Sequence, residues 1–391
     1  MTAEEDLRSL LVRRIRREGP ITFAAFMAEA LYHPRLGRYS SSRPPMGPEG
    51  DYITSPEVDE AFGRLVGRAV ADMASRIPPA SGGQGGNPFT VVEVGPGRGS
   101  LARDLLLGVG EEFPDLAFRL RYVLVESSES LRSVQRSVLS EAGLAGRVEW
   151  AAWNDLLRAE PITGCLLANE FLDALPVHLV EFSEGSLREV YVAAAADGSL
   201  HEILGEPSSE EVACYFDDLG VRLEEGQRAE VNLAALDWIA DAARLLESGY
   251  VVIIDYGHEA VDLYSEPRYA GTLVGYRRHQ LVVDLLANPG EQDLTSHLDF
   301  TSLVREARKH GFAAAPPTSQ RNFLVSMGLA HMIAAFAEPR EGIEEGERLS
   351  RRFALHALMS PSGMGSTFKV LVLARRAPID DLACLVNPFR V

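Results

Sequence analysis

The chain has 391 residues, 46% hydrophobic and 24% charged, a globular composition long enough for one large domain with insertions or for two domains. The formal net charge of −18 argues against a broad basic face for nucleic acid, and no segment is apolar enough to span a bilayer. Cys165, Cys214 and Cys384 are scattered, which argues against a disulfide framework. With an acidic N-terminus that lacks a signal-peptide layout, these features predict a soluble cytoplasmic protein.

Residues 1–88 are expected to form a helical region ahead of the main domain. Amphipathic patterns predict helices over residues 4–18 and 23–31, and Ser55 can cap a third helix that runs to about residue 77. An irregular segment, rich in proline and glycine, separates the second helix from the third. Its polar and aromatic candidates are Tyr39, Asp51, Tyr52, Thr54 and Glu57. Residues 78–88 read as a flexible linker.

From residue 89 to residue 391 short apolar strands alternate with helical patterns, which predicts a parallel α/β sheet covered by helices on both faces. The predicted strands are 89–94, 119–125, 147–153, 164–168, 250–254 and 366–374, and the predicted helices are 100–112, 128–141, 232–247, 299–310, 322–337 and 345–358. An inserted α+β lobe is expected at about residues 177–232. It begins with a hairpin and continues through a helical segment over residues 205–230.

A glycine-rich loop follows the first predicted strand, and helical spacing resumes at Ser100. Strand, glycine loop and helix in this order present free backbone N–H groups to a ligand. The glycines at 95, 97 and 99 have the spacing Gly-x-Gly-x-Gly, which is neither the dinucleotide fingerprint nor a phosphate loop. An acidic residue inside the strand, as Glu93 is, resembles the first motif of S-adenosylmethionine-dependent methyltransferases. A structural turn without a ligand stays open at this point.

Polar residues follow almost every predicted strand, at the edge where ligands bind in a parallel α/β sheet. Glu126 follows the second strand, where an acid suits a bidentate hydrogen bond to ribose hydroxyls. The later strands end at Asn154, Asp155, Asn169, Glu170 and Asp255. Because loops are polar anyway, one such residue means little, but the whole set predicts a nucleoside site.

The run Asn169-Glu-Phe-Leu-Asp-Ala-Leu-Pro176 is the second feature with chemical content. It places two carboxylates, Glu170 and Asp173, and one amide at a strand end before a turn. Carboxylates beside a bound sulfonium can orient a nucleophile and accept its developing charge or proton. Asn169 or Asp173 could equally cap a short helix.

These two runs resemble the MidA-like methyltransferases, and the resemblance extends over nearly the whole chain. Other matching motifs are Gly50-Asp-Tyr-Ile-Thr-Ser-Pro-Glu-Val58, Ile254-Asp-Tyr-Gly-His258 and Asp293-Leu-Thr-Ser-His-Leu-Asp-Phe300. This family includes the mitochondrial complex I assembly factor that methylates a protein arginine. The resemblance implies a Rossmann-like class I methyltransferase sheet, S-adenosylmethionine as cofactor, no metal, and a protein substrate such as a respiratory-complex subunit.

The resemblance also implies roles for particular residues. Cofactor contacts are expected from Glu93, Gly95, Gly97, Gly99, Glu126, Asn154, Asp155 and Asn169. Glu170 and Asp173 are expected to hold the methyl acceptor. Segment 32–58 is expected to cover the cofactor, and Tyr39, Asp51, Tyr52, Thr54, Glu57, His258 and His297 are expected to line the substrate side. The alternatives are a non-catalytic assembly protein that retains this fold and a nicotinamide-dependent oxidoreductase, which the glycine spacing disfavours.

Overall fold

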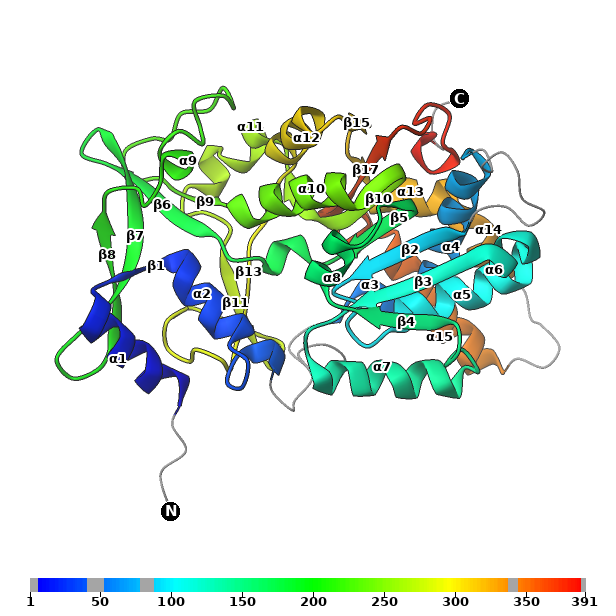
Figure 1. Cartoon of the computed structure of the whole chain (residues 1–391), viewed down its shortest axis with the longest axis horizontal. Helices are drawn as coiled ribbons and strands as arrows, with labels where there is room; N and C mark the ends of the chain where they lie inside the picture. The colour runs from blue at the N-terminus through cyan, green and yellow to red at the C-terminus, as the bar shows by residue number, and fades with distance from the viewer. Residues whose placement is uncertain (1–5, 41–52, 78–87, 337–343, 388–391) are drawn as a thin grey trace, which may run out of the picture. The chain divides into compact units, whose positions relative to one another are not determined.

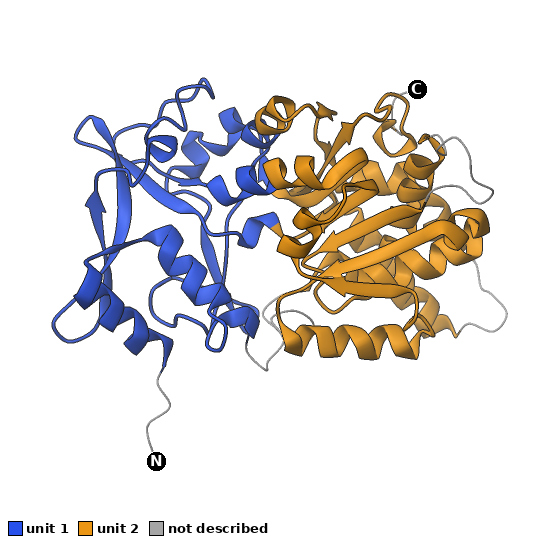
Figure 2. Ribbon diagram, in the orientation of Figure 1, with its two compact units in different colours: residues 1–52, 172–238, 257–303 blue, residues 53–171, 239–256, 304–391 orange. Residues whose placement is uncertain are grey.

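The computed structural model describes residues 6–40, 53–77, 88–336 and 344–387, and the chain divides into two compact units (Figure 2). Unit 1 comprises residues 1–52, 172–238 and 257–303, and unit 2 comprises residues 53–171, 239–256 and 304–391. This division differs from the expected boundary at residue 88. Residues 53–77 belong to unit 2, and the expected insertion forms part of unit 1 together with the N-terminal helices.

Unit 2 contains the predicted α/β sheet (Figure 1). In sheet order the strands are β15 (Ala313–Ala314), β17 (Phe368–Arg375), β10 (Leu246–His258), β5 (Ile162–Asn169), β2 (Phe89–Val94), β3 (Leu120–Val125) and β4 (Val148–Ala151). The five strands from β10 to β4 are parallel, and β17 pairs antiparallel with β10. The parallel sheet expected from the alternating pattern, and the Rossmann-like class that the family resemblance implies, are therefore confirmed.

Several helices of unit 2 follow the predicted pattern, and two predicted helices are each divided into shorter ones. The α-helices that lie entirely within unit 2 are α3 (Ser55–Val58), α4 (Ala61–Ser75), α5 (Ser100–Glu112), α6 (Pro114–Arg119), α7 (Glu129–Glu141), α8 (Trp153–Arg158), α13 (Gln320–Ser326), α14 (Leu329–Ala335), α15 (Glu345–Leu358) and α16 (Met364–Thr367). The expected helix 55–77 is interrupted at Asp59, whose backbone is extended and whose side chain accepts a hydrogen bond from the Ala61 N–H. The expected helix 322–337 breaks at Gly328, with φ 109°.

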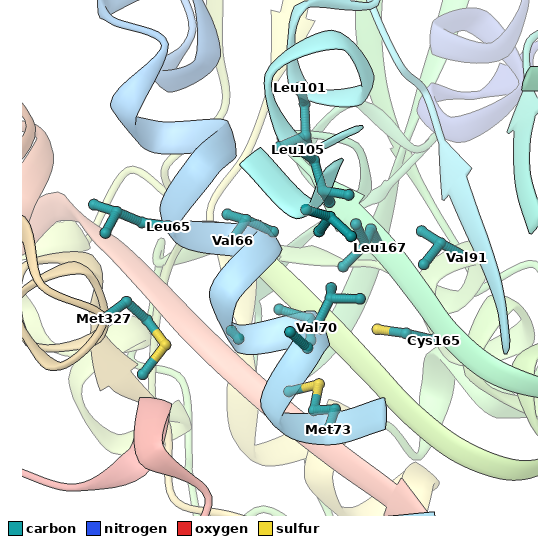
Figure 3. Close-up of a cluster of buried hydrophobic side chains, with 14 of the residues drawn as sticks. Leu65, Val66, Val70, Met73, Val91, Leu101, Leu105, Cys165, Leu167 and Met327 are labelled. Atoms are coloured by element: carbon teal, nitrogen blue, oxygen red, sulfur yellow. The ribbon is translucent and has the colours of Figure 1, made fainter. Parts of the chain in front are cut away.

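The main core of unit 2 lies between α4, α5 and the sheet (Figure 3). Its members include Leu65, Val66, Val70 and Met73 of α4, Leu101 and Leu105 of α5, Val91 of β2, and Cys165 and Leu167 of β5. Burying each large apolar side chain contributes about 1.5–3 kcal/mol. A Cβ at Gly63 of α4 would lie 2.6 Å from the Cβ of Asp104 in α5, so glycine lets the two helices approach closely. This packing fixes α5, whose N-terminus follows the glycine loop.

Unit 1 is built on two antiparallel sheets. The first consists of β1 (Ile21–Thr22), β7 (Ser186–Ala194), β6 (His178–Ser183) and β9 (Arg228–Val231), with β8 (Leu200–Gly205) on β7, and the second consists of β12 (Gln280–Val282), β11 (Val274–Arg277) and β13 (Asp293–Thr295). The helices α1 (Leu7–Glu18) and α2 (Phe23–Tyr32) pack against β7 through Phe23, Phe26 and their apolar neighbours. Shorter elements are η1 (Arg38–Ser40), η2 (Leu172–Ala174), α9 (Glu210–Ala213), α11 (Ala260–Leu263) and η3 (Glu266–Arg268).

The predicted hairpin of the insertion is confirmed as β6 and β7, but the helical character expected over residues 205–230 is wrong. That stretch contains one four-residue helix, α9, and the strand β9, which pairs with β6. The chain passes between the units within α10 (Leu233–Leu245), β10 and α12 (Phe300–Lys309). Within the described ranges, no helix combines the length and the apolar character needed to cross a membrane.

Candidate active site

The glycine loop of unit 2 has the conformation that its sequence requires. Gly95, Gly97 and Gly99 have φ values of 61°, 54° and 84°, in the left-handed region that glycine enters without strain. A Cβ at Gly95 would lie 2.8 Å from the ring of Phe171, so the loop packs directly on the turn that follows β5. Helix α5 begins at Ser100, and its N-cap residue Gly99 makes no side-chain cap. The first N–H groups of α5 are therefore free of side-chain caps, which suits a ligand.

Glu126, at the end of β3, is tied to the same loop by Gln135 of α7. The Gln135 side-chain amide donates 2.8 Å to the Gly97 carbonyl and 3.3 Å to Glu126 Oε2, and its oxygen accepts from the Trp150 indole at 2.9 Å. The Ser128 N–H donates to Glu126 Oε1 at 2.8 Å. Burial raises the pKa of Glu126, and these hydrogen bonds oppose the rise. No sequence pattern indicated a role for Gln135, because nothing in α7 sets it apart from a surface glutamine.

Asn169 and Glu170 form the turn that the Gly95 side of the loop contacts. Glu170 has φ 51°, which is rare for a residue with a side chain, and its N–H donates 2.8 Å to the Ile254 carbonyl of β10. Its Oε1 accepts from the Ser55 N–H at 3.0 Å and from the Asn169 side-chain amide at 3.2 Å. The Asn169 Oδ1 is buried and has no hydrogen-bond partner among the described residues.

Helix α3 joins this turn to the glycine loop. The expectation that Ser55 caps the helix is wrong, because Thr54 is the N-cap residue and makes no side-chain cap. Ser55 instead is fully buried, gives its N–H to Glu170, and donates its hydroxyl to Gln320 Oε1 at 3.1 Å. Glu57 lies 3.4 Å from Arg98 of the loop, measured between Oε1 and Nε. The motif Thr-Ser-Pro-Glu is thus a structural neighbour of the glycine loop within unit 2.

Three predicted cofactor residues of unit 2 have their described contacts outside this cluster. Glu93 is 2% exposed, and its carboxylate accepts a hydrogen bond from the Tyr122 hydroxyl in the sheet interior. Direct contact between Glu93 and a ligand at the strand end is therefore not supported. Asn154 and Asp155 lie on the exposed side of α8, and Asp155 pairs with Arg158 at 3.4 Å on the surface.

The remaining predicted residues with described positions belong to unit 1. Asp173 Oδ2 accepts from the Thr295 hydroxyl at 2.7 Å, and its backbone carbonyl accepts from the Ser296 N–H. The Tyr39 hydroxyl donates to Asp293 at 2.8 Å. These three hydrogen bonds connect other segments of unit 1 to β13 and to Ser296, the residue after it. Asp51, Tyr52 and the rest of residues 41–52, the middle of the expected covering segment, lie outside the described residues.

His258 and His297 stack on each other in unit 1, with ring centroids 5.4 Å apart. Arg268 lies 2.9 Å from His258 Nε2. Burial, reinforced by His258 and Arg268, lowers the pKa of His297 to about 4. The His297 ring is therefore neutral at pH 7. It borders a small pocket whose polar lining includes Tyr215, Glu230 and Asp299.

Comparison with known proteins identifies the family. Residues 65–318 match the family model described as "Putative S-adenosyl-L-methionine-dependent methyltransferase". The chain belongs to this methyltransferase family. The predicted MidA-like family, enzyme class and S-adenosylmethionine cofactor are thereby confirmed.

Curated relatives match almost the full chain. The Drosophila melanogaster protein arginine methyltransferase NDUFAF7 homolog, mitochondrial, is 31% identical over 94% of this chain and 84% of its own length. The mouse protein arginine methyltransferase NDUFAF7, mitochondrial, is 30% identical over 93% of this chain and 83% of its own. The predicted cytoplasmic location is contradicted, because these family members are named as mitochondrial proteins.

Two solved structures from Burkholderia thailandensis share the fold. One contains bound S-adenosyl-homocysteine and has a TM-score of 0.85 and 29% identity, covering 96% of this chain and 94% of its own. The other, a native structure, has a TM-score of 0.82 and 29% identity, covering 97% and 94% of the two chains. The family fold therefore extends over both units of this chain.

Proposed function

We propose that this enzyme methylates an arginine side chain of a protein substrate by direct displacement. Curated relatives that match more than nine-tenths of the chain are named protein arginine methyltransferases, and these names support arginine as the methyl acceptor. When bound, the cofactor supplies an electrophilic methyl group on a sulfonium. The family resemblance favours a subunit of a respiratory complex as the protein substrate.

The cofactor fits the contacts of unit 2. Left-handed glycines and the uncapped start of α5 leave backbone N–H groups at the loop, and Glu126 is held beside the loop by Gln135. We assign the ribose hydroxyls to Glu126, because a carboxylate can accept from two hydroxyls at once. The unpartnered Asn169 Oδ1 offers a further acceptor near the same loop.

The position of Glu170 is the observation that carries the arginine assignment. A guanidinium is protonated at neutral pH and has only donors, so a carboxylate that accepts from it draws the positive charge away from the attacking nitrogen. Two N–H donors fix Glu170 Oε1, and a third contact fixes its backbone. Its φ of 51° costs free energy that these contacts must offset, and such strain is common at functional sites.

Glu170→Gln tests the proposal, because glutamine keeps the shape and one acceptor but loses the charge. We expect methyl transfer to fall by about a hundredfold or more, a loss typical of removing one charge-stabilising group. Binding of S-adenosylhomocysteine, measured by calorimetry, should change little. Labelled methyl transfer into a lysate of a deletion strain, followed by mass spectrometry, identifies the acceptor protein and the modified residue.

The matched control is Glu111→Gln, which removes a surface carboxylate paired with Arg64 in the same unit. It should leave transfer at the wild-type level. Wild-type turnover in Glu170→Gln, or label on a residue other than arginine, would refute the assignment. Asp173 stays a predicted catalytic residue that holds the methyl acceptor, and Tyr39, Thr54, His258 and His297 stay predictions as substrate-side residues.

A further inference from the structure

Glu57 is a largely buried carboxylate, and one of its oxygens has an unfilled hydrogen-bonding position. Its side chain is 11% exposed, and its Oε1 lies 3.4 Å from Arg98 Nε. Its Oε2 is buried and has no hydrogen-bond partner among the described residues. Burial raises the pKa of Glu57, and the charge of Arg98 and a backbone hydrogen bond from Thr54 only partly oppose this effect. An unsatisfied carboxylate oxygen is costly inside a protein, so a donor from outside the chain would stabilise it.

Arg98 complements this carboxylate from the glycine loop itself. It stands between Gly97 and Gly99, its side chain is 35% exposed, and within the described part of the chain Glu57 is its recorded ion-pair partner. The recorded contact uses Nε and leaves the two terminal nitrogens of the guanidinium for another group. Those nitrogens form a fork that suits a carboxylate.

Other arginine–glutamate pairs of unit 2 show how unusual this geometry is. Arg64 contacts both oxygens of Glu111, at 2.5 and 3.2 Å, and Arg68 contacts both oxygens of Glu112, at 2.7 and 3.1 Å. In those pairs both carboxylate oxygens accept a hydrogen bond from the arginine, and the pairs lie on the surface. In the Glu57–Arg98 pair the carboxylate is more deeply buried and the N–O distance of 3.4 Å is longer. Glu57 Oε2 and the terminal nitrogens of Arg98 are available for another group.

The Glu57 carboxylate, with its unfilled Oε2, lies beside the Arg98 guanidinium. The negative charge of Glu57 suits the ammonium group of an α-amino acid, and the positive charge of Arg98 suits its carboxylate. We propose that Glu57 and Arg98 bind the amino-acid end of the cofactor. Glu57 Oε2 accepts from its ammonium group, and the Arg98 guanidinium donates to its carboxylate. The inference rests on the proposed function, since it assumes that unit 2 binds S-adenosylmethionine at the glycine loop. It moves Glu57 from the substrate side, where the sequence placed it, to the cofactor.

The test compares ligands that differ only at the amino-acid end. Calorimetry is run with S-adenosylhomocysteine, with its analogue lacking the carboxylate, and with methylthioadenosine, which lacks the whole amino-acid end. The variants are Glu57→Gln, Arg98→Met and the control Glu111→Gln. Glu57→Gln and Arg98→Met should each weaken S-adenosylhomocysteine binding by roughly ten- to a hundredfold, the range for a hydrogen bond between charged groups.

The pattern across ligands identifies each partner. Methylthioadenosine should bind the wild type and both variants within about twofold, which also shows that the variants keep a folded nucleoside site. The carboxylate-free analogue should lose affinity in Glu57→Gln and keep its wild-type affinity in Arg98→Met.

Equal losses for all three ligands, or no loss for any, would overturn the assignment. So would unchanged S-adenosylhomocysteine affinity with a raised KM for the acceptor protein, because Glu57 would then contact the substrate guanidinium. A wild type that binds none of the three ligands would instead refute the proposed function.

Discussion

The hydroxyl of Tyr122 donates a 2.7 Å hydrogen bond to the carboxylate of Glu93 inside the sheet of unit 2. Both side chains are almost fully buried, and burial raises the pKa of Glu93 to about 8 although the Tyr122 contact opposes the rise. The acidic residue of the first motif is therefore neutral at pH 7. It supports the strand that leads into the glycine loop.

This neutral carboxyl group predicts a pH-dependent stability. Between its usual pKa near 4.5 and its folded pKa near 8, the folded state holds a proton that the unfolded state releases. The contribution of Glu93 is therefore complete at low pH and is lost as the pH rises through this window, by at most about 1.4 kcal/mol per pH unit. Glu93→Gln mimics the protonated form, so its stability relative to wild type should increase from pH 5 to pH 8. Urea unfolding at several pH values measures this difference, and a constant difference would mean that Glu93 is ionised in the fold.

The hydrogen bonds of Gln135 predict that replacing this residue weakens cofactor binding, although Gln135 itself has no catalytic contact. Gln135→Leu removes the bridge between the Gly97 carbonyl and Glu126 and leaves the Trp150 indole without its acceptor. We expect S-adenosylhomocysteine to bind about tenfold more weakly, the effect of roughly 1.4 kcal/mol. An analogue with a 2′,3′-dideoxyribose should lose much less, because the effect acts through the contact of Glu126 with the ribose. Equal losses for both ligands would show a general disturbance of the loop.

The close contact between Gly95 and Phe171 predicts that adding one methyl group at position 95 distorts the glycine loop. Gly95→Ala must place a Cβ 2.8 Å from the Phe171 ring at φ 61°, so we expect a stability loss of about 1–3 kcal/mol and much weaker cofactor binding. Gly110→Ala is the matched control, because a Cβ at this glycine of α5 meets no atom within 4 Å. It should stabilise the protein by roughly 0.5–1 kcal/mol. Thermal unfolding and calorimetry compare the two, and equal behaviour would refute the steric argument.

His297 predicts an acid-side loss of stability. Its folded pKa of about 4 lies below its usual value of 6.5, so the unfolded state binds a proton in this window and the folded state does not. Its contribution is complete above about pH 6.5 and is lost as the pH falls to about 4. His297→Gln should therefore reduce the fall in stability on acidification. His201→Gln, which changes an exposed histidine of the same unit, should leave the acid limb as in wild type.

Local patterns in the sequence were sufficient to predict the parallel sheet and the glycine loop. Alternating strands and helices predicted a parallel sheet covered by helices, and the run of three glycines predicted a tight turn at the start of a helix; the strand order and the left-handed glycines come from the structure. Contacts between distant positions could not be read in this way. Ser55 has the local signature of a helix cap, yet its hydroxyl bonds to Gln320, 265 positions away. No residue near Ser55 in the sequence indicates that Gln320 is its partner.

The division into units was also beyond local reasoning. Unit 1 is assembled from three segments, and each was judged from the sequence by its immediate neighbours. The strand β9 was missed for a similar reason. Its four residues, Arg-Ala-Glu-Val, carry a weak strand signal, and their pairing with β6 decides their structure.

The interleaved order of the units has a consequence for synthesis on the ribosome. The parallel strands β2, β3, β4, β5 and β10 are all made before β17, which pairs with β10 and carries β15 and β16 (Thr318–Ser319) on its other side. Until residue 375 has emerged, the backbone of β10 has an unpaired edge that could bind a second nascent chain. A premature stop before β17 should therefore yield an aggregating product, whereas the segments of unit 1 are already complete by residue 303.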